Sequence, residues 1–129
     1  MAKLYKSGED YLEMILMLHL KQSYVRAVDV AHELEVSKPS VSRAMGILRD
    51  GGFIRIAEDG NILLTQTGSE VAERIYERHR ILTQWLTDIG VPEDIAAADA
   101  CKLEHDISAE SFACLKEHLR NAHPNVHTD

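Results

Sequence analysis

Residues 27–50 place the tightest restriction on how this 129-residue chain can fold. Apolar side chains recur at helical spacing over 27–35 and again over 38–50. Only a tight turn separates the two segments. It ends in Ser37, a residue type that commonly caps helices, and Pro39 falls in the first turn that follows. Two short helices joined in this way form a helix-turn-helix. The side chains expected to face inward are Val28, Ala31, Leu34, Val41, Ala44, Met45 and Leu48.

A β-hairpin is predicted directly after this pair of helices. Two glycines end the second helix, and the segments 53–56 and 62–65 that follow are rich in β-prone side chains. They flank a turn that contains Asp59-Gly60, a frequent hairpin signal. A hairpin in this position makes the unit a winged helix-turn-helix. An additional helix over 7–22, capped by Ser7, precedes it.

The second helix of the pair leaves small polar and basic side chains exposed. Small residues let a helix approach base edges in the major groove, and Arg43 is long enough to reach a guanine or a phosphate. Residues 37–55 carry four basic side chains against one acid, although the whole chain has a net charge of −7. Double-stranded operator DNA is therefore the predicted partner, and a winged helix that contacts only protein is the alternative. The candidate DNA-binding residues are Ser37, Lys38, Pro39, Ser40, Ser42, Arg43 and Arg49.

Three more helices are predicted after the hairpin. Thr67 and Glu70 have the spacing of a capping box, which would open a long helix to about Ile89. Pro92 opens the next helix, to about His105, and Ser108 caps a last one, to about Asn121. Because two such short helices bury their own apolar faces poorly, we expect a homodimer.

The predicted fold class is mainly α with a small β-hairpin wing. A winged helix-turn-helix domain is expected over residues 1–66, and an all-helical metal-binding and dimerisation domain over 67–122. Residues 123–129 are expected to form a flexible tail.

Cys101, Glu104 and His105 stand at helical spacing i, i+3 and i+4, which places them on one helix face. A thiolate, a carboxylate and an imidazole are all metal ligands. A half-buried cysteine beside two surface polar residues would explain the same pattern without a metal. Asp10 and Glu13 also share a helix face, but acids near a helix N-terminus are favoured there by the helix dipole alone.

His79 is the odd member of the apolar stripe along the long helix, and a histidine in such a place is more often a core residue than a ligand. With it, candidate ligands come from three helices of a chain that also carries a winged helix. That combination is more specific than any one of its parts.

At this point the sequence resembles the diphtheria toxin repressor family of metal-dependent transcriptional repressors. The likeness is to its short two-domain form, of the manganese transport regulator type. It covers residues 5–120, and the matching stretches are Glu9–Glu13, Val36–Ser42, Leu63–Gly68, Glu77–His79 and Cys101–His105. The resemblance implies a repressor of metal-uptake genes and no enzyme activity. The metal ligands that it implies are Asp10, Glu13, His79, Cys101, Glu104 and His105.

The ligand set leaves the metal open between Mn²⁺ and Fe²⁺. Asp10 resembles the manganese branch of the family and Cys101 the iron branch. Hard carboxylates suit Mn²⁺, whereas a thiolate shifts preference toward Fe²⁺ and later metals, so Zn²⁺ and Co²⁺ are expected to bind in vitro. Two ions per protomer would bind if Glu13 and Glu104 bridged them. Thr83 and Ala97 stand where the iron branch has an acid and a histidine, so its ancillary site is not expected.

The composition narrows the remaining choices. Two cysteines imply no disulfide framework, and the apolar runs are too short to span a bilayer or to form a signal peptide. We therefore expect a cytoplasmic protein with no membrane partner and no organic cofactor. Two alternatives stay open: a winged-helix regulator that answers a small organic ligand or oxidation of Cys101, and a small metalloenzyme. The second lacks a spare general base once six groups bind metal.

Overall fold

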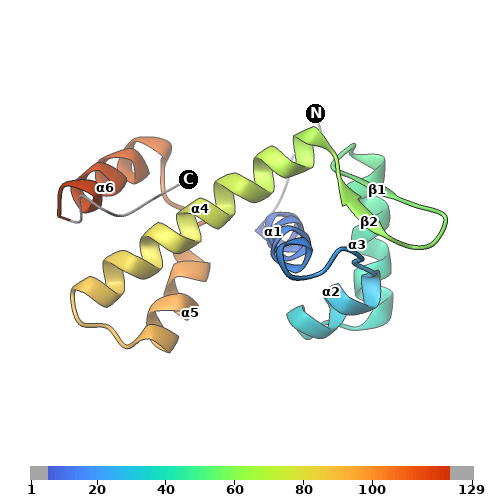
Figure 1. Ribbon diagram of the computed structural model, residues 1–129, viewed down its shortest axis with the longest axis horizontal. Coiled ribbons are helices and arrows are strands. Elements are labelled where there is room, and N and C mark those ends of the chain that lie inside the picture. Colours follow the sequence, from blue (N-terminus) through green and yellow to red (C-terminus); the bar gives the residue numbers. More distant parts are fainter. Residues whose placement is uncertain (1–5, 123–129) are drawn as a thin grey trace. The chain divides into compact units, whose positions relative to one another are not determined.

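The computed structural model describes residues 6–122 (Figure 1). The predicted tail over 123–129 lies outside the described residues. The chain divides into two compact units, residues 1–73 and 74–129. The first contains the helix-turn-helix and the hairpin, and the second is entirely helical where it is described.

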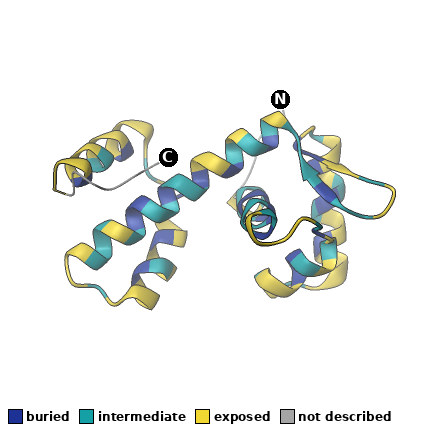
Figure 2. Ribbon diagram, viewed as in Figure 1, coloured by how far each residue is buried: buried dark blue, intermediate teal, exposed yellow. Residues whose placement is uncertain are grey.

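The first unit is a winged helix. Its elements are α1 (Lys6–Lys21), α2 (Ala27–Leu34), α3 (Lys38–Asp50), β1 (Ile54–Ile56) and β2 (Ile62–Leu64), and it includes the start of α4 (Gln66–Asp88). The two strands are antiparallel, with Ile54 opposite Leu64 and Ile56 opposite Ile62. The core lies among the helices and the root of the wing, where the dark segments of Figure 2 gather. It contains Leu12, Ile15, Val30, Val41, Phe53 and Ile62.

Ser37 caps α3 as the sequence predicts, because its side-chain oxygen accepts a hydrogen bond from the Ser40 amide. Two other caps were predicted wrongly. Ser7 lies inside α1 rather than before it. The helix α4 begins at Gln66, and the Thr65 hydroxyl accepts from the Gly68 amide at 3.1 Å, so Thr65 caps this helix and the predicted box at Thr67 does not.

Val28 is also a wrong prediction, since 50% of it is exposed. The buried residues of α2 are Val30 and Ala31, so the face that packs on the core is rotated from the one expected. Periodicity gives the spacing of an apolar stripe, but α2 has only eight residues and several faces fit it equally well.

The second unit contains most of α4 together with α5 (Glu93–Leu103) and α6 (Ala109–Ala122). Pro92 stands at the N-cap of α5, and the Ser108 hydroxyl caps α6 by accepting from the Ser111 amide at 3.0 Å. A small core of Ile81, Phe112 and Leu119 joins α4 to α6. The fold class is therefore as predicted. None of the helices in residues 6–122 has the length and apolar character needed to cross a membrane.

Candidate metal centre and nucleic-acid interface

Glu104 is the most unusual polar residue of the second unit, because its side chain is fully buried. It directly follows α5 and keeps helical backbone angles, with its amide donating to the Ala100 carbonyl at 2.9 Å. Its Oε2 lies 2.9 Å from Nδ1 of His79. Its Oε1 lies 3.6 Å from Nε2 of His105 and accepts no hydrogen bond from the residues that the structure describes.

A buried carboxylate oxygen without a donor is costly, and a cation is one way to offset that cost. The chemistry of the neighbours fits a divalent transition metal, because two imidazoles and a carboxylate converge there. His105 exposes only 2% of its side chain and His79 24%. The residues present therefore fit the metal that the sequence implies.

Cys101 lies on α5 one turn before Glu104, and it is exposed. The helix ends at Leu103, two residues earlier than predicted. Because Glu104 keeps a helical conformation, it still follows Cys101 at the spacing of one helical turn. The early end of the helix thus leaves the predicted i, i+3 relation intact.

Asp10 and Glu13 belong to the first unit, where they lie one turn apart on α1. Glu13 is buried in a helix whose other buried members are apolar or aromatic, and Asp10 is partly buried. An acid in such a position is expensive unless something offsets its charge. The predicted ligands thus fall into two groups, two acids in the first unit and four residues in the second.

Arg78 is the site residue that sequence reasoning missed. It is only 8% exposed, and its Nη1 donates to the carbonyl oxygens of Glu104 at 3.3 Å and Ile107 at 2.7 Å. One signal was available in the sequence. Arg78 stands three residues after Ile75 and three before Ile81, on the buried stripe of α4.

The predicted DNA face of α3 is formed by side chains that the core leaves free. Val41, Met45 and Leu48 of this helix are buried. The predicted DNA-binding residues are all exposed: Ser37, Lys38, Pro39, Ser40, Ser42, Arg43 and Arg49. The Ser37 hydroxyl also bonds that of Ser40 at 2.8 Å, which fixes the polar start of the helix.

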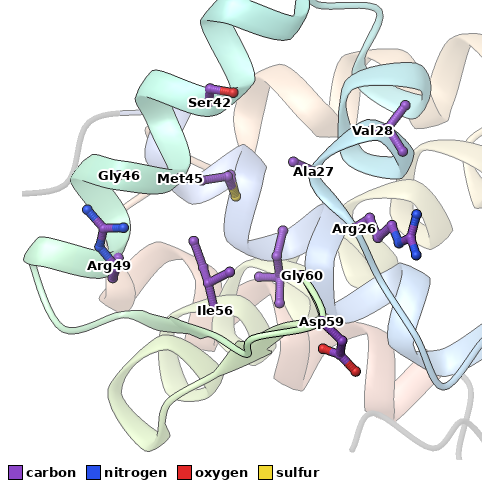
Figure 3. A pocket seen from close by; sticks show the side chains of 11 residues that line it. Arg26, Ala27, Val28, Ser42, Met45, Gly46, Arg49, Ile56, Asp59 and Gly60 are labelled. Atoms are coloured by element: carbon purple, nitrogen blue, oxygen red, sulfur yellow. The ribbon is translucent and has the colours of Figure 1, made fainter.

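A groove of about 650 Å³ lies beside this face, between α3, the start of α2 and the wing (Figure 3). Met45 and Ile56 give it apolar walls, and Arg26, Arg49 and Asp59 stand among its polar lining residues. A hydrogen bond with the Tyr24 side chain raises the pKa of the Arg26 guanidinium further above the physiological range, in which an arginine is charged in any case.

Two protein-family models match this chain, one over each half. The model of the iron dependent repressor N-terminal DNA binding domain matches residues 3–62. The model of the iron dependent repressor metal binding and dimerisation domain matches residues 65–129. The chain belongs to the iron-dependent repressor family, and the resemblance seen in its sequence is confirmed.

Relatives of this chain include transcriptional regulators named MntR. The transcriptional regulator MntR of Salmonella typhimurium is 36% identical over 104 residues, which are 81% of this chain and 66% of that protein. The regulator MntR of Bacillus subtilis is 33% identical over 106 residues, 82% of this chain and 75% of its own.

Two solved structures of other proteins also superpose on most of this chain. The manganese regulator SloR superposes with a TM-score of 0.79 at 26% identity, over 88% of this chain and 53% of its own. The IdeR of T. acidophilum superposes with a TM-score of 0.78 at 27% identity, over 92% and 55%. The chain thus spans about two thirds of the Salmonella relative and about half of these two structures.

Proposed function

We propose that this chain is a metal-dependent, DNA-binding transcriptional repressor that controls metal-uptake genes, with Mn²⁺ or Fe²⁺ as the effector. The observation that carries the proposal is the fully buried carboxylate of Glu104, which has an imidazole close to each of its oxygens. No role in the packing of an apolar core accounts for that arrangement.

The proposed ligands are Asp10, Glu13, His79, Cys101, Glu104 and His105. A bound divalent ion would supply the positive charge that offsets their carboxylates and thiolate. The imidazoles of His79 and His105 would bind it as neutral ligands, and Cys101 would bind it only as a thiolate. Metal affinity should therefore fall as the pH falls, because protons compete for the same ligand atoms.

The proposed mechanism joins the two groups of ligands. Asp10 and Glu13 are carried by the DNA-binding unit, and the other four residues by the dimerisation domain. An ion bound by both groups would hold the two copies of α3 in a homodimer, the proposed recognition helices, at the spacing of successive major grooves, about 34 Å. Without the shared ion the acids repel one another, and DNA binding then includes the cost of ordering the winged helices.

We propose that the first domain ends at residue 66. The two matched family models support this position, because one ends at residue 62 and the other begins at residue 65. Ile89, Ile95 and Leu103 of the second domain are exposed although they are large and apolar. A dimer contact that covers such side chains would remove apolar surface from water.

Because a repressor acts on the chromosome, we place the protein in the cytoplasm.

Arg43 supplies a prediction for the DNA face. Replacing it by alanine should weaken operator binding by about 1–3 kcal/mol if it reads a guanine, and the loss should fall on one base position. If it instead contacts a phosphate, binding should weaken uniformly and the slope of log affinity against log salt should fall by about one. Fluorescence anisotropy over a salt series distinguishes the two results. Unchanged affinity at every salt concentration would remove Arg43 from the interface.

Cys101 supplies a prediction for the choice of metal. Cys101→Glu replaces a soft thiolate by a hard carboxylate, so the affinity for Mn²⁺ should rise relative to Fe²⁺ and Zn²⁺. Competitive titration under anaerobic conditions measures the ranking. Cys114→Ser is the matched control, because that thiol is also exposed but lies on α6. The same ranking in wild type and Cys101→Glu would show that Cys101 does not select the metal.

The proposal as a whole is tested by calorimetric titration of the dimeric protein with Mn²⁺, followed by binding to the DNA upstream of its own gene. Metal binding that leaves DNA affinity unchanged would contradict the proposed switch.

A further inference from the structure

We propose that Arg78 is a positioning residue for the metal ligands, and that it links the turn carrying Glu104 and His105 to the C-terminal helix α6. The inference rests on the metal site proposed above. It concerns one unit of the chain, in which all the contacts that carry it are internal.

The first observation is that neighbouring residues of α4 hold the main chain and the side chain of the same ligand. Arg78 donates to the Glu104 carbonyl oxygen at 3.3 Å. His79 contacts the Glu104 carboxylate at 2.9 Å. The position of the carboxylate depends on the backbone that carries it, so a residue that fixes this backbone also fixes the ligand atoms.

The second observation is the place at which Arg78 donates. The last carbonyls of a helix have no partner within the helix. Arg78 Nη1 donates to two carbonyl oxygens that follow the end of α5, those of Glu104 and Ile107. These residues bracket His105, so the guanidinium spans the whole ligand-bearing turn.

The third observation concerns α6. The Arg78 guanidinium carbon lies 5.4 Å from the centre of the Phe112 ring, within the range of a cation–π contact. Lys116, one turn further along α6, forms an ion pair of 2.8 Å with Glu77. Glu77 and Arg78, which are adjacent on α4, therefore each contact α6. Arg78 also donates to the ligand-bearing turn, so it connects this turn to α6. A lysine would reproduce this connection only in part, because its ammonium lacks the planar guanidinium that lies near the Phe112 ring.

The test uses the full chain loaded with Co²⁺, because the visible spectrum of this ion reports its coordination geometry and its thiolate ligation. Arg78→Gln removes the cation, and Arg78→Lys keeps the charge but not the planar guanidinium. Arg74→Gln, one turn earlier at an exposed position of α4, is the control for loss of charge. We expect Arg78→Gln to bind Co²⁺ about 10–100-fold more weakly, with shifted d–d bands, as for other groups that orient metal ligands. Arg78→Lys should recover part of the affinity, and Arg74→Gln should match wild type.

The outcomes separate the two proposals. If wild type binds no Co²⁺, the proposed metal site itself fails. If wild type binds but Arg78→Gln has the same affinity and spectrum, the metal site stands and the role of Arg78 is wrong. Circular dichroism shows whether the variants keep their helices. If Arg78→Gln does not fold, Arg78→Lys decides, and an unchanged Co²⁺ affinity and spectrum in that variant would overturn the inference.

Discussion

Glu104→Gln should lower the affinity for Mn²⁺ by at least about 100-fold, more than the loss usual for a group that only orients a ligand. The substitution keeps the size of the side chain and an oxygen that can contact His79, but it removes the charge. Without metal the variant should be as stable as wild type or more stable, because a buried carboxylate carries a desolvation cost. The same change therefore opposes function and favours the metal-free fold.

Two measurements check this pair of effects. Calorimetric titration gives the metal affinity, and urea unfolding in chelator gives the free energy of unfolding without metal. Glu117→Gln is the control, because that carboxylate is exposed and, within residues 6–122, pairs with Arg120 alone, at 3.3 Å. A variant at Glu104 that bound Mn²⁺ like wild type would show that this carboxylate is not a ligand. A large loss of stability in chelator would show that its role is structural.

Gly68→Ala should damage the winged helix severely, with a loss of about 3 kcal/mol or more in the free energy of unfolding. A Cβ atom at this position would overlap the Phe53 carbonyl oxygen and lie 2.9 Å from its carbonyl carbon. These are backbone atoms next to the wing, so no side-chain rotation relieves the clash. The Thr65 cap fixes the same turn of α4 and limits its movement away from the wing.

The control for Gly68→Ala is another helical glycine with room around it. A Cβ atom on Gly46 of α3 would meet nothing closer than the Arg49 guanidinium at 4.0 Å. Gly46→Ala should therefore stabilise the fold by about 0.5–1 kcal/mol, since alanine restricts the unfolded chain and favours helix. Thermal unfolding of both variants compares them directly. Equal effects of the two substitutions would contradict the close approach at Gly68.

The sequence predicted the order and kind of the elements well, because their signals are local. Ser37 and Ser108 cap helices that begin at the next residue, as a short-range side-chain bond requires. Thr65 was missed in favour of Thr67, because both threonines are followed by residues that helices accept. Thr65 differs in a long-range contact, since its hydroxyl also donates to the Gly52 carbonyl at 2.7 Å. A sequence pattern contains no such contact.

Exposure was harder to predict than secondary structure. Val28 was assigned to the core, yet half of it is exposed. A periodic stripe shows that a helix has an apolar side. Whether that side meets the core of the same chain or another surface depends on neighbours that are distant in sequence.

The ligand-bearing turn shows both what helical spacing can predict and what it cannot. Helical spacing grouped Glu104 with His105, and the structure brings both of them to His79 through the Glu104 carboxylate. The same reasoning treats an arginine as a surface residue by default, so Arg78 was passed over. In the structure Arg78 donates to the carbonyl oxygens of Glu104 and Ile107, which follow α5, and the position of these acceptors becomes known only from the fold.

The most direct test of the metal switch is the affinity for DNA upstream of the chain's own gene, measured at fixed salt with Mn²⁺, with Fe²⁺ under anaerobic conditions, and with chelator. We predict binding about 5–150-fold tighter with the effector metal than with chelator, a coupling of about 1–3 kcal/mol. By linkage the same DNA should tighten metal binding by the same factor. DNA affinity that is unchanged by chelator would contradict the account.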